Sequence, residues 1–133
     1  MPWRELPHTA DLRLEITAAD WPQLLREATL ALAAQLGEPD RAAPPVARPL
    51  RIEALDREEL LVRWLNEALV WCELEGLLPV DATVTPIGDA GAVGVMTLQP
   101  VRKRHVTIKA TTYHGLAIEP TADGLVVRIL FDT

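Results

Sequence analysis

Apolar and polar residues alternate with a period of two near the start of the chain. The segment from Ala10 to Thr17 has leucine or isoleucine at every second position, with charged residues between them. This period is that of a half-buried β-strand. The segment therefore predicts a first strand in which Leu12, Leu14 and Ile16 face the core.

Two later segments have the apolar spacing of amphipathic helices. The first begins after Asp20 and ends at Gly37, and the second begins after Asp56 and ends near Gly76. Each aspartate is followed three residues later by Gln or Glu, the pattern of a capping box, and glycine is a common helix stop. The predicted apolar face of the second helix comprises Leu60, Leu61, Trp64, Leu65, Ala68, Leu69 and Cys72.

The remaining segments favour extended structure. The proline-rich stretch from Glu38 to Pro49 predicts a surface connection, and the alternation of Leu50, Ile52 and Ala54 predicts another strand. The dipeptide Asp123-Gly124 is typical of a hairpin turn. Four further strands are predicted over Val80–Pro86, Ala92–Val101, Val106–Ile118 and Leu125–Phe131.

This order of elements predicts an α+β fold, in which two helices pack on one face of a mixed, largely antiparallel β-sheet. The chain has 133 residues, which suits a single domain over residues 1–133. Hydrophobic residues make up 49% of the chain and no apolar run has the length of a signal peptide or membrane span, so we expect a cytoplasmic protein. The one cysteine, Cys72, is expected to be a buried thiol, and Trp64 and Trp71 are expected to pack in the core or an interface.

The net charge of −6 argues against a protein that holds RNA by itself, because neutralising phosphates needs a basic face. The exception is the basic stretch Arg102-Lys103-Arg104-His105, which we interpret as a turn between strands. Such a turn is either simply solvated or touches a nucleic acid or an acidic partner. We therefore expect any link to RNA to run through another protein.

Three features carry candidate chemistry. The first is the polar run His8-Thr9-Ala10-Asp11 before the first strand. The second is Lys109, which the alternation places on the face opposite Val106, Ile108 and Ala110, together with Thr107 and Thr111. The third is the end of the sequence, where Asp132 and the carboxylate of Thr133 follow the last strand. Taken singly, each carboxylate also fits a solvated strand end, and the lysine fits an exposed sheet edge.

A sheet that brings the first and last strands side by side would gather Asp11, Asp132 and the carboxylate of Thr133. Such hard oxygen donors suit calcium or magnesium. They do not suit zinc, because the sequence lacks the paired Cys or His spacing of a zinc site.

Several segments together resemble the archease family. His8-Thr9-Ala10-Asp11 is similar to the opening of that family, and residues 60–67 are similar to its "LL..WLNE" helix. Residues 108–116 closely match its "VKAVTYHGL" strand, and Phe131-Asp132-Thr133 is similar to its acidic end. These matches come in the order of the family and span essentially the whole chain.

The resemblance implies a non-catalytic protein that activates the RtcB-type RNA ligase of tRNA splicing and RNA repair. It implies a divalent metal, calcium, held by Asp11 and Asp132 with Thr133 as a further ligand, and a functional role for Lys109. Archeases commonly have acidic residues before the lysine strand, whereas residues 98–105 here form a shorter and basic segment.

Two alternatives remain open at this point. A small hydrolase or isomerase would use His8 and Asp11 as base and orienting group, with Lys109 stabilising charge. A chaperone-like adaptor would recognise its partners through exposed Trp and Leu side chains. An enzyme turns over a substrate alone and an adaptor binds unfolded chains, whereas a ligase activator acts only with its ligase.

Overall fold

The computed structural model describes residues 2–6 and 11–133. Their elements are, in chain order, β1 (Trp3–Leu6), β2 (Leu12–Ala18), α1 (Trp21–Leu36), β3 (Gly37–Pro39), β4 (Val46–Glu53), α2 (Arg57–Glu75), β5 (Leu77–Ile87), β6 (Gly91–Arg104), β7 (Ala110–Thr112), β8 (Ile118–Thr121) and β9 (Gly124–Asp132). Neither helix in this part of the chain combines the length and apolar character needed to cross a membrane.

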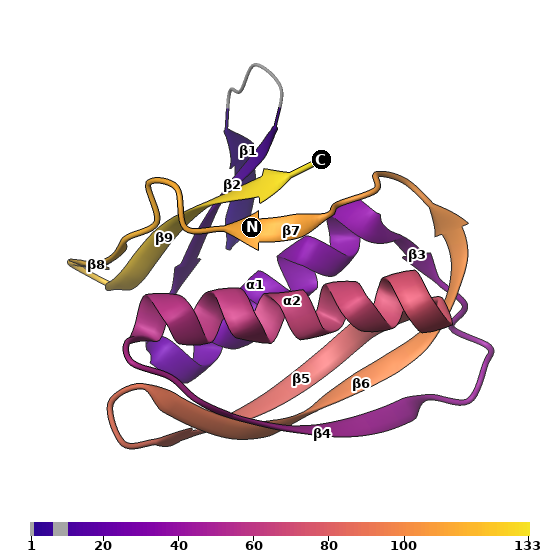
Figure 1. Ribbon diagram of the computed structural model, residues 1–133, viewed down its shortest axis with the longest axis horizontal. Coiled ribbons are helices and arrows are strands. Elements are labelled where there is room, and N and C mark those ends of the chain that lie inside the picture. Colours follow the sequence, from indigo (N-terminus) through magenta and orange to yellow (C-terminus); the bar gives the residue numbers. More distant parts are fainter. Residues whose placement is uncertain (1, 7–10) are drawn as a thin grey trace.

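The strands form two sheets with the helices between them (Figure 1). One sheet is five-stranded, with the order β1-β2-β9-β7 and β8 also paired to β9; the other is four-stranded, with β6 paired to β3, β4 and β5. Helix α1 contacts β2 and β5, and α2 contacts β7 and β5, so each helix touches both sheets. The predicted α+β class is confirmed. The strands nevertheless divide into two sheets, and every pairing that the structure describes is antiparallel.

Both helices begin and end where the sequence predicts. The Asp20 side chain accepts a hydrogen bond from the Gln23 backbone N–H at 2.9 Å, and Asp56 accepts one from Glu59 at 2.8 Å. These bonds satisfy amide groups that have no partner within the helix. Gly76 ends α2 with a φ of 63°, in the left-handed region that glycine adopts without steric cost.

The core lies where the helices face the two sheets. Trp64 of α2 is fully buried, and its indole N–H donates to the Thr29 hydroxyl of α1 at 3.0 Å. Cys72 is also buried, and burial raises the pKa of its thiol. Both placements confirm the sequence prediction. Trp71 is only half-buried, and the Arg48 guanidinium lies over its ring at 5.7 Å.

The predicted continuous strand over Val106–Ile118 is wrong. Only Ala110–Thr112 forms a strand, residues 105–109 are extended without sheet pairing, and Ile118 opens a separate strand after a turn at Gly115. The φ of Gly115 is 65°, a backbone conformation that interrupts any strand.

Other strand bounds also differ from the prediction. Within the expected surface connection, β3 occupies Gly37–Pro39 and β4 already begins at Val46. Strand β4 pairs with β6 only, so Pro49 can lie in this edge strand without breaking a ladder on its other side. The short strand β1 was not predicted.

Candidate functional site

Three strands of the five-stranded sheet, β2, β9 and β7, meet at a common end (Figure 1). Leu12 at the start of β2 lies opposite Phe131 of β9, and Ala110 at the start of β7 lies opposite Asp132. Asp11 directly precedes Leu12. Asp11 and Asp132 therefore lie at the same end of the sheet, although they come from opposite ends of the sequence.

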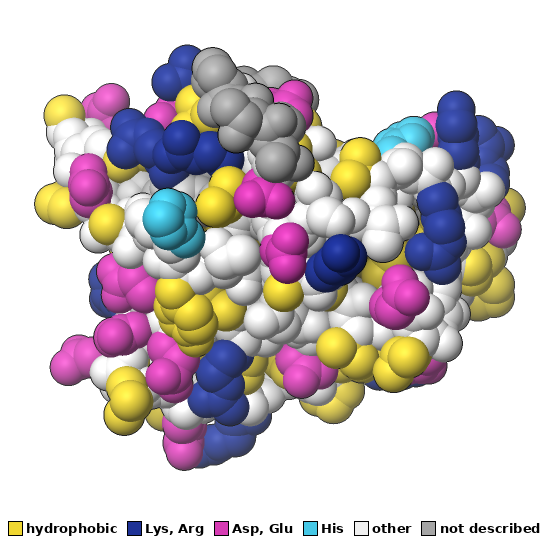
Figure 2. All heavy atoms as spheres, turned by 45° about the horizontal axis from the view of Figure 1, so that its top comes forward, with side chains coloured by type: hydrophobic (Ala, Val, Ile, Leu, Met, Phe, Trp, Pro, Cys, Tyr) yellow, Lys and Arg dark blue, Asp and Glu magenta, His cyan; other side chains and the backbone are white. Residues whose placement is uncertain are grey.

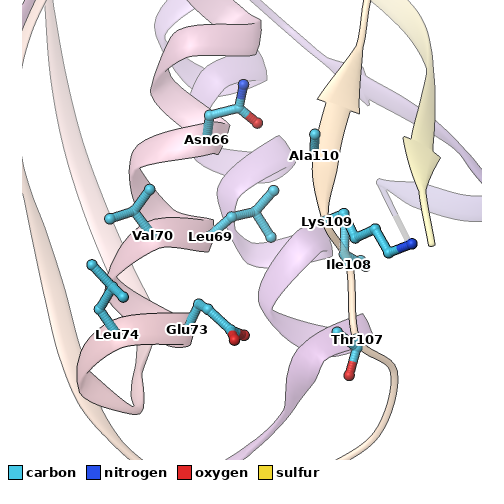
Figure 3. Close-up of a pocket in the computed structure, with 9 residues that line it drawn as sticks. All are labelled: Asn66, Leu69, Val70, Glu73, Leu74, Thr107, Ile108, Lys109 and Ala110. Atoms are coloured by element: carbon cyan, nitrogen blue, oxygen red, sulfur yellow. The ribbon is translucent and has the colours of Figure 1, made fainter.

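Lys109 is attached to this end of the sheet through its backbone. Its N–H donates to the carbonyl oxygen of Asp132 at 2.7 Å. Its side chain is exposed and points away from α2, whereas the preceding Ile108 is 7% exposed (Figure 3). The outward direction predicted for Lys109 is confirmed. The same alternation is wrong for Val106, which is exposed, and for Thr111, which is 4% exposed, because residues 105–109 are not a regular strand.

Helix α2 holds the strand that follows Lys109. The side-chain oxygen of Asn66 accepts a hydrogen bond from the Thr111 backbone N–H at 2.9 Å. The hydroxyl oxygen of Thr111 is buried and has no hydrogen-bond partner among residues 2–6 and 11–133. Asn66 was not among the residues predicted for this site. Its signal was a short polar side chain inside an otherwise apolar helical pattern, where asparagine commonly needs a specific partner.

The carboxylates at this end of the sheet are donors of the kind that calcium and magnesium prefer. Asp132 is exposed and Asp11 is half-buried, so water or a partner can reach both. Within residues 2–6 and 11–133, no three His, Cys, Asp or Glu side chains gather as a metal-binding group. The chemistry of these two carboxylates fits a hard cation.

Comparison with known proteins identifies the family. The model of the archease protein family (MTH1598/TM1083) matches residues 3–133. The chain belongs to this family. The motifs of the sequence analysis fall within the match, and the two longest of them, on α2 and around β7, are joined by the Asn66–Thr111 hydrogen bond.

Archeases of known sequence and structure resemble the chain along almost its full length. It is 32% identical to the archease of Methanopyrus kandleri over 126 residues, which cover 90% of each protein. The crystal structure of the Thermotoga maritima archease, described as a possible chaperone, superposes with a TM-score of 0.72 at 26% identity, covering 98% of this chain and 96% of that one. Protein 1598 of Methanobacterium thermoautotrophicum, at 23% identity and 99% coverage of both chains, has the same fold with a TM-score of 0.77.

The basic stretch of this archease-family chain is not a turn. Arg102, Lys103 and Arg104 form the end of β6. Glu38 of β3 faces three cationic or titratable groups, with nitrogen–oxygen distances of 3.9 Å to Arg102, 4.0 Å to Lys103 and 3.6 Å to His105. The face in Figure 2 has Lys and Arg in small groups separated by acidic and apolar side chains, so it carries no continuous basic surface.

The family motif continues past β7 along the N-terminal half of α2. Tyr113 is 56% exposed. Partial burial and the nearby carboxylates of Glu59 and Asp56 raise the pKa of its hydroxyl. His8, the base of the hydrolase alternative, lies outside the described residues, so the structure does not place it against Asp11 or Lys109.

Proposed function

We propose that this protein is an activator of an RtcB-type RNA ligase, promoting ligase guanylylation and multiple turnover in tRNA splicing and RNA repair. The observation that carries the proposal is the hydrogen bond between the Lys109 N–H and the Asp132 carbonyl, at 2.7 Å. It fixes an exposed lysine beside an exposed carboxylate at a sheet end that Asp11 also reaches. Family membership supports the same reading.

The proposed mechanism is electrostatic. Guanylylation of the ligase concentrates negative charge on a nucleotide triphosphate, and positive charge held at that point lowers the barrier. Lys109 supplies one such charge from a backbone position that its neighbours fix. Asp11 and Asp132, with the carboxylate of Thr133, would hold a divalent cation, which supplies further positive charge and orients phosphates when bound.

On this proposal the protein has no catalytic residue of its own and works in the cytoplasm with its ligase. Its net charge of −6 disfavours direct capture of RNA. RNA is therefore reached through the ligase, while the net negative charge keeps this protein from competing with the ligase for RNA.

A second candidate function is a chaperone-like adaptor. It is favoured by exposed apolar side chains, among them Leu55 at 89% and Leu74 at 77% exposure, and by the description of the Thermotoga maritima relative. An adaptor would suppress aggregation of an unrelated unfolded protein, measured by light scattering, without any ligase. An activator of the proposed kind would not.

The test of the proposed function is covalent guanylate incorporation into a purified RtcB-type ligase, with and without this protein. We expect Lys109→Ala to lose at least about tenfold of the stimulation, because removing one charge-stabilising group typically has that effect or more. Lys109→Arg keeps the charge but changes its reach and donor geometry, so we expect partial rescue.

Lys103→Ala is the matched control, because Lys103 is the other lysine of the sequence and its side chain is 68% exposed. It should stimulate the ligase as much as the unmodified protein does. The free energies of unfolding of both alanine variants should lie within about 0.5 kcal/mol of that of the unmodified protein. Full stimulation by Lys109→Ala would exclude the role of the lysine. Absence of any stimulation by the unmodified protein would exclude the activator function itself.

A further inference from the structure

A groove runs between α2 and the extended segment that leads to Lys109. Residues 107–110 form one wall and α2 forms the other, and the hollow has a volume of about 650 Å³ (Figure 3). This volume lies within the range of about 300–1,000 Å³ that is typical of ligand pockets. The helix contributes Asn66, Leu69, Val70, Glu73 and Leu74.

The groove has an apolar floor and an exposed apolar rim. Leu69 and Ile108 are 6% and 7% exposed, so they close its base. Val70 and Leu74 also line it and are 46% and 77% exposed. Val106, just before the other wall, is 43% exposed. Val70 and Leu74 lie one helical turn apart on α2, and neighbouring exposed apolar side chains mark interaction surfaces more often than isolated ones do.

The charge inside the groove selects the chemistry of its occupant. Glu73 points from α2 into the space facing residues 107–108, whereas the Lys109 ammonium group points out on the far side of its segment (Figure 3). The one charge directed into the groove among its lining side chains is therefore negative. A carboxylate beside apolar side chains repels phosphate groups and favours a cation on an apolar scaffold.

We infer that this groove docks a segment of the RtcB-type ligase that carries apolar side chains and a Lys or Arg facing Glu73. The inference rests on the proposed function and adds a second contact to it. The two contacts are continuous, because residues 107–110 form the groove wall and also carry Lys109. A segment held in the groove fixes the position of Lys109 relative to the ligase, so docking and charge stabilisation act through the same stretch of chain.

The apolar part of the inference is tested with the double variant Val70→Ser, Leu74→Ser. Both side chains are exposed enough for serine to be tolerated without loss of the fold. We expect its dissociation constant for purified ligase, measured by calorimetry, to rise at least about tenfold, as for loss of buried apolar anchors. Leu55→Ser is the matched control, because Leu55 is 89% exposed and does not line the groove.

The charge part is tested with Glu73→Lys, which should weaken ligase binding by roughly tenfold or more through repulsion of the docked cation. Asp89→Lys makes the same charge change at an exposed turn outside the groove and should leave binding unchanged. Equal weakening by both variants would reduce the effect to net charge and overturn the inferred cation contact.

The outcomes separate the groove from the proposed function. Normal ligase binding and normal guanylylation with the double serine variant would overturn the groove, while the effect of Lys109→Ala would still support the activator. A protein that neither binds nor stimulates the ligase would overturn both. A final measurement is the sedimentation of this protein alone. If it forms a dimer that the double serine variant cannot form, the groove binds a second copy of the chain instead of the ligase, and the inference is overturned.

Discussion

At the scale of single residues, Trp64 contacts both the other helix and a strand of the four-stranded sheet. The apolar spacing of α2 predicts that Trp64 is buried but not which elements it contacts. It is fully buried, and its N–H reaches the Thr29 hydroxyl, which in turn donates to the Leu25 carbonyl at 2.8 Å. Its ring also comes so close to β6 that a Cβ on Gly94 would lie 2.9 Å from it. One side chain thus joins both helices and one sheet.

We expect Trp64→Ala to lower the free energy of unfolding by about 3–5 kcal/mol, because it leaves a large cavity. Trp64→Phe keeps an aromatic ring at this position but loses the N–H and part of the ring volume, so the loss of stability should be smaller than in Trp64→Ala. Denaturant unfolding followed by circular dichroism measures both. A midpoint unchanged in Trp64→Ala would contradict the central position of this side chain.

Residues whose environment depends on near neighbours were predicted correctly from the sequence. Asp20 and Asp56 cap helices as predicted, and Lys109 points outward as predicted. The burial of Thr111 was not predicted, because the regular alternation breaks before β7. The role of Asn66 was not predicted, because its hydrogen bond to Thr111 joins two distant segments and leaves no period in either. The role of Lys109 in ligase activation stays a prediction.

At the scale of elements, one carboxylate joins three strands of the larger sheet. Glu15 of β2 accepts a hydrogen bond from Arg4 of β1 at 2.9 Å, and its other oxygen lies 2.9 Å from Arg128 of β9. The Arg4 hydrogen bond above all, with the charges of both arginines and the Arg128 hydrogen bond, lowers the pKa of Glu15. The Glu15 side chain is 13% exposed.

A lowered carboxyl pKa means that the unfolded chain binds more protons than the folded one, so stability rises with pH. The contribution of Glu15 should be complete above its ordinary pKa of 4.5 and should disappear as the pH falls through the lowered value. We expect Glu15→Gln to cost about 1 kcal/mol or less at pH 7, since the arginine partners are largely exposed. The measurement is urea unfolding of both proteins from pH 7 to pH 3.

The difference between the two proteins should shrink only in the acid range. Glu119→Gln, at an exposed position of β8, is the control and should produce no comparable pH-dependent difference. A difference that persists unchanged at pH 3 would assign the loss to packing instead of charge.

Elements with strong local signals were predicted well, and short or irregular ones were not. Both helices and the hairpin between β8 and β9 follow from caps, glycines and Asp123-Gly124; Thr121 pairs with Gly124 across that turn. Strand β1, with four residues, has too few positions to display a period. The β-branched residues of 106–118 suggested one long strand, although pairing with β9 supports only Ala110–Thr112 in this stretch before the turn at Gly115.

At the scale of the whole molecule, the division into two sheets could not be predicted from local patterns. Which strands pair depends on contacts between distant segments, and alternation alone does not assign a strand to one sheet or the other. The arrangement assumed for the candidate metal site, with β2 and β9 side by side, is present, with Leu12 to Ala18 paired to Phe131 to Leu125. Metal binding at that junction stays a prediction.

We expect Asp11→Ala and Asp132→Ala each to abolish calcium binding, measured by calorimetry, while leaving thermal unfolding without metal nearly unchanged. Thermal unfolding should change little because neither residue belongs to the buried core. Calcium binding should be lost because each variant removes one of the two carboxylates proposed to hold the cation. Asp89→Ala removes a carboxylate from a distant exposed turn and should bind calcium normally. Undiminished calcium affinity in both site variants would show that the site lies elsewhere.

The pairing of β2 with β9 also sets an order of events during protein synthesis. The segment of β2 leaves the ribosome before either helix, whereas its neighbour β9 is made only after both helices and the whole of the other sheet. Until then the buried side of β2 has helix α1 to pack against, while one strand edge stays unpaired. Contacts so far apart along the chain form slowly. The end of the sheet that carries Asp11, Asp132 and Lys109 is therefore completed only once β9 has been made, so a nascent chain that stops short of β9 cannot present this surface to a partner.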